Sequence, residues 1–426
     1  MMNLGENLQF AANQKEVDVI NEKFYGKIKY PWPPAAFEKI TRSDFWTKMI
    51  SQDIGYWQKN IFPKNMNIWV AGCGTNQAIF TALKFPEARI IGSDLSKESL
   101  HICQKNADNL EIKNLELRHE SINSVKYSNL FDYIVCTGVI HHNSNPVIAL
   151  SRLTKALKSN GIIELMVYNK FHRLTTSAFQ LAIRLLVEGS TEPNLDKELP
   201  IAKMLVKNFK NETSMGNFLK TVDSLPDAAF ADALLQPVEH SYTIESLIKI
   251  ASECNLELLT FCIDQFSCIG TNFTWNLDFE DHNLQNLYDN LSDNKRWQIT
   301  NLLKGEKSPM LWFYMQKRDS SRQRKTERQI CEEFLNTKFK KVDLLKNLYV
   351  QKSDNSYSKE PMTVRFPPIR NFLFDEVKKI YCNLDEDIPI RYTLQKQKIN
   401  QTFNTINKLR SCLATSSFPY LEAYQP

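Results

Sequence analysis

Apolar runs with the spacing of strands alternate with runs that have the spacing of helices between residues 67 and 317. Strands are expected at 67–72, 88–94, 115–121, 131–139 and 158–169, and helices at 75–85, 96–110 and 145–157. Strands that alternate with helices of about 10–15 residues predict a parallel sheet with right-handed crossovers. The sequence therefore indicates an α/β fold.

The rest of the chain departs from this alternation. Residues from about 170 to 240 read as helices without strands, which predicts a helical insertion after the fifth strand. A helix at 243–254 and strands at 255–264 and 309–317 then resume the α/β pattern, the last two as an antiparallel pair. We expect the following organisation: an N-terminal helical or lid segment at 1–66, the α/β domain at 67–317, a polar, basic linker at 318–329, and a small, mostly helical C-terminal domain at 330–426.

Composition excludes several classes of protein. The 426 residues are 42% hydrophobic and 24% charged, as in ordinary globular proteins. No secretory signal and no apolar run of the ~20 residues that span a membrane is seen. The nine cysteines are scattered without a Cys-x-x-Cys pair, so neither a disulfide framework nor a metal site is predicted, and a cytoplasmic location is expected.

The net charge of +5 is unevenly distributed. Residues 319–426 hold 19 lysines and arginines against 13 aspartates and glutamates, whereas the remainder holds 34 against 35. The basic excess suits either an acidic partner or an ordinary solvated surface. Because residues 1–318 carry no such excess, a nucleic acid is not the expected substrate.

Two glycines stand at the end of the first expected strand, in "NIWVAGCGTN" (67–76), although the chain has only 12. Gly72 and Gly74 lack a Cβ, so the backbone there can approach a ligand closely. Asp94 ends the second strand, where a carboxylate can accept both hydroxyls of a ribose, although it can also cap the next helix. Glycine turn and acid together predict a ligand that contains a nucleoside.

The segments "VAGCGTNQA", "IGSDLSKESL" and "FDYIVCTGVIHHNSNPVIALSRLTKALKSNGIIELMVYN" resemble class I S-adenosylmethionine-dependent methyltransferases over about residues 68–169. Family members show an acidic residue shortly before the first glycine, where this chain has Val70 and Ala71. The resemblance implies a Rossmann-like sheet of seven strands, mostly parallel with the last antiparallel, and S-adenosylmethionine as cofactor. The residues that it implies for cofactor binding are Gly72, Cys73, Gly74, Asn76, Asp94, Leu95, Glu120, Ser121, Thr137 and Gly138.

Methyl transfer from a sulfonium requires alignment of donor and acceptor and, for some acceptors, removal of a proton. Candidates should lie at the carboxyl ends of the strands. His142 is the expected base, with His141 and Tyr168 as neighbours that orient the acceptor, although a loop-holding role for the histidines and a packing role for Tyr168 stay open. His240 and Tyr242 could reach the same cleft.

The stretch "YGKIKYPWPP" (25–34) could cover the cofactor as a lid, with Tyr30 or Trp32 against the sulfonium, or could only pack on the sheet edge. The insertion at 170–240 should form a wall of the acceptor pocket.

Three functions are compatible with these observations. The first is methyl transfer to an oxygen or nitrogen of a small molecule or peptide, as in natural-product biosynthesis. The second is methylation of a protein or precursor peptide that docks on the C-terminal domain. The third is a non-catalytic, cofactor-binding interaction protein. The sequence leaves the acceptor and the oligomeric state open.

Overall fold

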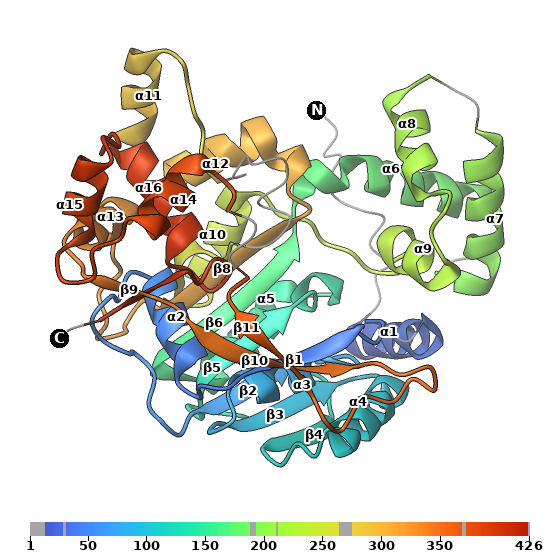
Figure 1. The fold of residues 1–426 in the computed structure, drawn as a ribbon. Helices are drawn as coiled ribbons and strands as arrows, with labels where there is room; N and C mark the ends of the chain where they lie inside the picture. Colours follow the sequence, from blue (N-terminus) through green and yellow to red (C-terminus); the bar gives the residue numbers. More distant parts are fainter. Residues whose placement is uncertain are drawn as a thin grey trace.

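A seven-stranded sheet forms the centre of the molecule (Figure 1). The computed structural model describes residues 13–28, 31–187, 193–209, 212–263, 275–368 and 372–424. The strand order is β4 (Leu115–His119), β3 (Arg89–Asp94), β2 (Asn67–Ala71), β5 (Phe131–Thr137), β6 (Leu157–Tyr168), β8 (Met310–Lys317) and β7 (Leu256–Phe261). The pairs from β4 to β6 are parallel, and β8 is antiparallel to both β6 and β7. The predicted Rossmann-like, mostly parallel sheet is confirmed.

Helices cover both faces of this sheet. α3 (Gln77–Lys84) and α4 (Lys97–Asn109) pack on one face, and α5 (Pro146–Ala156) and α10 (Ile244–Glu253) on the other. Ser96 begins α4 as an N-cap, because its side chain accepts the backbone N–H of Ser99 at 3.1 Å. The loops that join strand to helix therefore gather at the carboxyl edge of the sheet, where open α/β sheets bind ligands.

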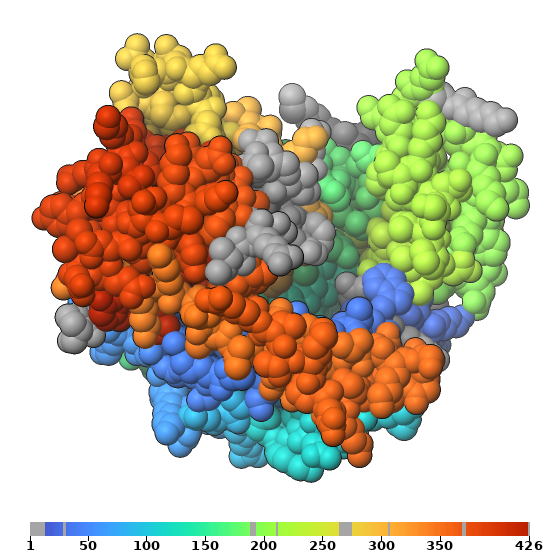
Figure 2. Space-filling model, in the orientation of Figure 1, coloured from blue at the N-terminus to red at the C-terminus, as the bar shows by residue number. Residues whose placement is uncertain are grey.

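A helical lobe follows β6. It contains α6 (Lys170–Leu186), α7 (Leu195–Asn208), α8 (Ser214–Val222) and α9 (Asp227–Leu234), which share an apolar core of their own. In Figure 1 this lobe stands beyond the carboxyl end of β6, and Figure 2 shows that the surface is hollowed between it and the C-terminal part of the chain. The lobe therefore borders the edge of the sheet at which ligands are expected.

The N- and C-terminal segments pair with each other. α1 (Gln14–Ile28) contacts α4 and α9, and β1 (Ala36–Ile40) joins β10 (Leu344–Val350) and β11 (Met362–Phe366) in a second sheet. α2 (Phe45–Asp53) lies beside β12 (Leu421–Ala423), which pairs with β9 (Phe339–Lys341). The remaining elements are η1 (Ile140–His142), α11 (His282–Asp289), α12 (Asp293–Lys304), η3 (Gly305–Lys307), α13 (Glu327–Leu335), α14 (Asp375–Cys382), α15 (Ile390–Lys396) and α16 (Phe403–Leu413).

The C-terminal segment packs against the central sheet and α12, while the predicted linker at 318–329 stays a prediction. α13 already begins at Glu327, and this buried carboxylate pairs with the buried Arg296 of α12. Phe334 of α13 lies in the same apolar core as Trp57 and the strands of the central sheet. Local composition marked 318–329 as polar, but it could not reveal that these polar groups pair with a distant helix. Within the described residues, no helix combines the length and the apolar character needed to cross a bilayer.

Candidate active site

The turn that follows β2 brings backbone close to the carboxyl ends of its neighbours. Gly72 and Gly74 have φ of 70° and 52°, in the left-handed region that disfavours side chains. A Cβ on Gly72 would lie 2.3 Å from Cγ2 of Val139, in the loop after β5. The N–H groups of Gly72 and Cys73 both donate to the carbonyl of Ser93, at 2.8 and 2.9 Å. Glycine is thus required at position 72 by both conformation and space.

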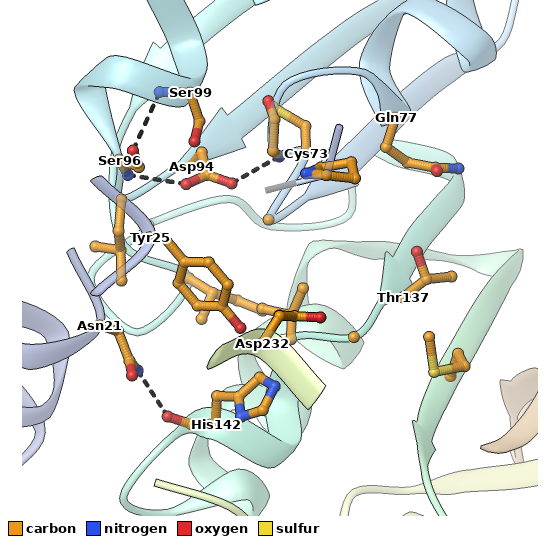
Figure 3. Close-up of a pocket in the computed structure, with 18 of the residues that line it drawn as sticks. Asn21, Tyr25, Cys73, Gln77, Asp94, Ser96, Ser99, Thr137, His142 and Asp232 are labelled. Atoms are coloured by element: carbon orange, nitrogen blue, oxygen red, sulfur yellow. Dashed lines mark hydrogen bonds between the residues drawn. The ribbon is translucent and has the colours of Figure 1, made fainter. Parts of the chain in front are cut away.

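Asp94 anchors this turn to the next strand (Figure 3). Its Oδ2 accepts the N–H of Gly74 at 2.7 Å, and its Oδ1 accepts the N–H of Ser96 at 2.8 Å. Burial raises the pKa of Asp94, although hydrogen bonds from the backbone N–H groups of Ser96, Gly74 and Leu95 act in the opposite direction. The carboxylate therefore both holds the glycine turn and faces the cavity beside it.

A cavity of about 470 Å³ lies over these residues. Eight of the predicted cofactor residues line it: Gly72, Cys73, Gly74, Asp94, Leu95, Glu120, Thr137 and Gly138. The other two do not. Asn76 is buried and donates from Nδ2 to the carbonyl of Trp32 at 2.5 Å, and Ser121 holds the turn after β4 by accepting the N–H of Asn123 at 3.2 Å.

The N-terminal segment closes one side of the cavity. Tyr25 of α1 and Pro31 line it, and the Thr75 hydroxyl donates to the carbonyl of Pro31. Trp32 is 47% exposed, and Tyr30 lies outside the described residues. Tyr25 and Pro31 thus lie beside the cavity, whereas Trp32 does not line it, and the lid role of this stretch stays a prediction.

The two adjacent histidines differ in their surroundings. His142 lines the cavity, and its Nδ1 lies 2.8 Å from the carbonyl of Val238. Since a carbonyl only accepts, Nδ1 carries the proton and Nε2 is bare. Burial lowers the pKa of His142 to about 4. His141 is fully buried, does not line the cavity, and packs its ring on Tyr168 with centroids 4.1 Å apart.

A buried ion pair supports the cavity from the helical lobe. Arg173 of α6 donates to Glu239 from Nε at 2.7 Å and from Nη2 at 2.5 Å, and Gln180 donates to the same carboxylate at 3.1 Å. The guanidinium also lies over the ring of Tyr168, 4.4 Å from its centroid. Tyr168 and Arg173 line the cavity. The positive charge of Arg173 is therefore neutralised by Glu239 within the protein.

Asp232 of α9 brings a second carboxylate into the cavity, and this one has no cationic partner at ion-pair distance within the described part of the chain. Its Oδ1 accepts from Gln236 at 2.9 Å, and the same amide donates to the hydroxyl of Tyr25 at 3.1 Å. Burial raises the pKa of Asp232 to about 7, against the opposing effect of Arg173. Figure 3 shows Asp232 projecting into the cavity on the side of Tyr25 and His142.

Sequence reasoning missed much of this wall. Asp232 and Trp312 belong to elements whose place in the cavity depends on long-range packing, and no motif marks them, whereas Tyr25 begins the 25–34 stretch that was considered as a lid. The lining residues that were not predicted for the cofactor or catalysis include Asn21, Tyr25, Gln77, Ser96, Ser99, Ile122, Asn143, Met166, Arg173, Asp232, Met310 and Trp312. His240 donates its N–H to the carbonyl of His141, and neither it nor Tyr242 lines the cavity. Among the described residues, no group of three His, Cys, Asp or Glu side chains could hold a metal.

Comparison with known proteins agrees with this geometry. A family described as "Methyltransferase domain" matches residues 63–223. The structure of PKMT2 from Rickettsia typhi has a TM-score of 0.58 at 15% identity and covers 92% of this chain and 77% of that one. The same protein in complex with AdoHcy has a TM-score of 0.55 at 14% identity, covering 93% and 77%. Residues 63–223 are thus similar to a methyltransferase domain, and the fold of the chain is similar to that of PKMT2, in agreement with the resemblance to class I S-adenosylmethionine-dependent methyltransferases seen in the sequence.

Curated relatives of this chain match over shorter lengths. A protein of Synechococcus is 27% identical over 201 residues, which cover 45% of this chain and 47% of that protein. A tRNA U34 carboxymethyltransferase of Helicobacter pylori is 30% identical over 160 residues, covering 34% and 59%, and a protein of Rickettsia prowazekii is 38% identical over 160 residues, covering 35% and 62%. The chain thus spans less than two thirds of each of these relatives, whereas the likeness of fold to PKMT2 extends to the C-terminal segment.

The resemblance implies S-adenosylmethionine as the cofactor, and the cavity can be tested against it. The residues present fit it. The cavity of about 470 Å³ lies within the range of small-ligand sites. The turn presents Gly72, Cys73 and Gly74 to the cavity, and Asp94 offers a carboxylate at the place of a ribose acid.

Proposed function

We propose that this chain is a methyltransferase that transfers a methyl group from S-adenosylmethionine to the nitrogen of an alkyl amine, carried by a small molecule or a peptide. The observation that carries the proposal is Asp232, a carboxylate that lines the cavity without a cationic partner among the described residues. A buried carboxylate without a counter-ion costs several kcal/mol, so an ammonium group suits this place better than a hydroxyl.

The proposed cofactor contacts follow the lining of the cavity. Gly72, Cys73 and Gly74 would lie along the methionine part and Asp94 would accept the ribose hydroxyls, with Leu95 and Glu120 toward the adenine and Thr137 and Gly138 beside the methionine chain. Asn76 and Ser121 would contribute indirectly, Asn76 by holding the glycine turn and Ser121 by holding the loop after β4. When bound, the cofactor supplies a methyl group on a positively charged sulfur.

An amine must lose its proton before its lone pair can take the methyl group. Asp232 is the proposed base. The proton of the ammonium would pass to a carboxylate oxygen of Asp232, which would leave a neutral nitrogen whose lone pair can take the methyl group that S-adenosylmethionine would supply. A group with a pKa of about 7 is well matched to this task at neutral pH. The buried surroundings also lower the pKa of the amine itself, which assists the transfer.

The three residues predicted for catalysis, His142, His141 and Tyr168, have supporting roles in this proposal. His142, with a pKa of about 4, is a poorer base than Asp232 at neutral pH. Its bare Nε2 can accept a hydrogen bond from the acceptor, and Tyr168 can orient the acceptor beside it. His141 would support the ring of Tyr168 from behind. His142 remains the proposed base if the acceptor is a hydroxyl.

Transfer of labelled methyl to matched amines and alcohols of equal chain length tests the proposal, with free compounds and with lysine- and serine-containing peptides. We expect methylation of amines and a rate that rises with pH through about 7, because Asp232 must be ionised. Asp232→Asn should lower kcat by about 10²–10⁴, the usual effect of a positioned base, with unchanged affinity for S-adenosylhomocysteine.

Asp227→Asn is the matched control. Asp227 lies on the same helix, but its side chain is 71% exposed and pairs with Lys203 at the surface. A preference for alcohols, or an Asp232→Asn enzyme with the kcat and pH profile of Asp227→Asn, would refute the amine proposal. Binding of S-adenosylhomocysteine without methyl transfer to any acceptor of the panel would favour the non-catalytic alternative.

A further inference from the structure

A second cavity, of about 320 Å³, continues along the same face of the sheet. Tyr168, Met166 and Glu164 are every second residue of β6 and therefore lie on the same face of the strand. Tyr168 and Met166 line the active-site cavity, and Glu164 lines the second cavity. Trp312 of β8 and Gln77 of α3 border both cavities. The second cavity is therefore separate from the reaction site but lies directly beside it, beneath α2 and α3.

Glu164 gives this cavity a negative charge that only neutral groups contact. Its Oε1 accepts from Nε1 of Trp312 at 3.0 Å, and its Oε2 accepts from the hydroxyl of Tyr133. Burial, together with the charge of Glu164, raises the pKa of Tyr133, so this phenol stays a donor. No lysine, arginine or histidine in the described ranges lies within ion-pair distance of Glu164.

The other charged groups near the cavity do not supply the missing cation. Lys84 borders it, but its ammonium lies over the ring of Trp46, 4.9 Å from the centroid. Asp53 adds a further carboxylate behind Tyr314, which donates to it at 2.9 Å. The interior thus combines a negative charge with aromatic walls from Phe80, Tyr133, Trp312 and Tyr314.

Carboxylates and the faces of aromatic rings both attract organic cations. We propose that this second cavity is a binding site for an organic ammonium ion with a small apolar body, held by the carboxylate of Glu164 against the surrounding rings. The ring of Trp46, with Lys84 above it, shows the same type of contact at the border of the cavity, made by the protein itself.

Choline and its neutral carbon isostere, in which a tert-butyl group replaces the trimethylammonium group, form a matched pair of probes. Calorimetry with the full chain saturated with S-adenosylhomocysteine measures both. We expect choline to bind and the isostere to bind at least about tenfold more weakly, because the isostere lacks the positive charge that the carboxylate and the aromatic ring faces attract. Glu164→Gln, which preserves shape, should weaken choline by about tenfold or more.

Two further measurements locate the binding. The indole N–H of Trp312 donates to Glu164, so its resonance in tryptophan-labelled protein, assigned with Trp312→Phe, should shift on addition of choline. Asp232→Asn should leave choline affinity unchanged, which separates this site from the proposed amine site. Equal affinity for the isostere, undiminished binding by a folded Glu164→Gln protein, no binding at millimolar choline, or a loss caused by Asp232→Asn alone would each overturn the proposal.

Discussion

The shared core of the central sheet and the C-terminal segment leads to a prediction on stability. Phe334 of α13 is fully buried, and its ring lies 5.4 Å from Trp57 and 5.1 Å from Phe339 between centroids. Phe334→Ala leaves a cavity among these rings, and buried phenylalanines truncated to alanine cost about 3–5 kcal/mol. A loss of about 4 kcal/mol changes the unfolding constant by about three powers of ten, a large part of the total stability of a typical protein.

Denaturant unfolding should show that this loss of stability also affects the part of the molecule that contains the active site. We expect one cooperative transition, followed both by tryptophan fluorescence and by binding of S-adenosylhomocysteine, and a shift of that transition in Phe334→Ala. Tyr392→Ala is the control within the same segment, because Tyr392 is 50% exposed and should cost little. A fragment ending at residue 317 should aggregate, since it exposes the surface that Phe334 covers.

Independent domains would give the opposite outcome. Two transitions would then be seen, Phe334→Ala would move only the one that does not respond to S-adenosylhomocysteine, and the 1–317 fragment would fold and bind the cofactor. That result would refute the argument from the shared core and support the predicted linker at 318–329.

Three further predictions concern the cavity. Asp94→Asn should weaken S-adenosylhomocysteine about 10–100-fold by calorimetry, because the amide can no longer accept from both Gly74 and Ser96; unchanged affinity would show that the ribose binds elsewhere. Gly72→Ala should abolish measurable binding, and adding Val139→Ala should restore part of it, since the new Cβ meets Val139; full binding by Gly72→Ala alone would contradict the turn geometry. His142→Gln should retain the rise of activity near pH 7 if Asp232 is the base, and loss of that rise would return the role to His142.

Local patterns predicted the central sheet closely. The strand expected at 131–139 is β5 at Phe131–Thr137, and that at 309–317 is β8 at Met310–Lys317. Each of these strands is a short apolar run with turn residues at both ends. All the residues that identify such a strand therefore lie close together in the sequence. The pairing of β1 with β10 joins residues 36–40 to residues 346–350, and nothing in either stretch alone indicates its partner.

The distinction between local sequence signals and long-range packing also applies to the residues that line the cavity. Gly72 and Asp94 could be predicted because a glycine turn and an acid at a strand end are tied to sequence spacing. Asp232 could not, because it is one of many acids on surface-like helices, and only the fold of the helical lobe turns it inward. Residues of a cofactor site are thus marked by local chemistry, whereas residues of an acceptor site depend on tertiary packing.

The charges around the acceptor end support the proposal of an amine over other acceptors. Arg173 and Glu239 neutralise each other, so the cavity is left with the charge of Asp232 alone on this side. An anionic acceptor such as a carboxylate would meet this charge at close range, with no cation of the described residues available to offset it. A neutral hydroxyl would leave the carboxylate unpaired, whereas an ammonium group pairs with it on arrival and gives up its proton to it before transfer. In the proposed function, one carboxylate on α9 would therefore account for both the recognition and the activation of the acceptor.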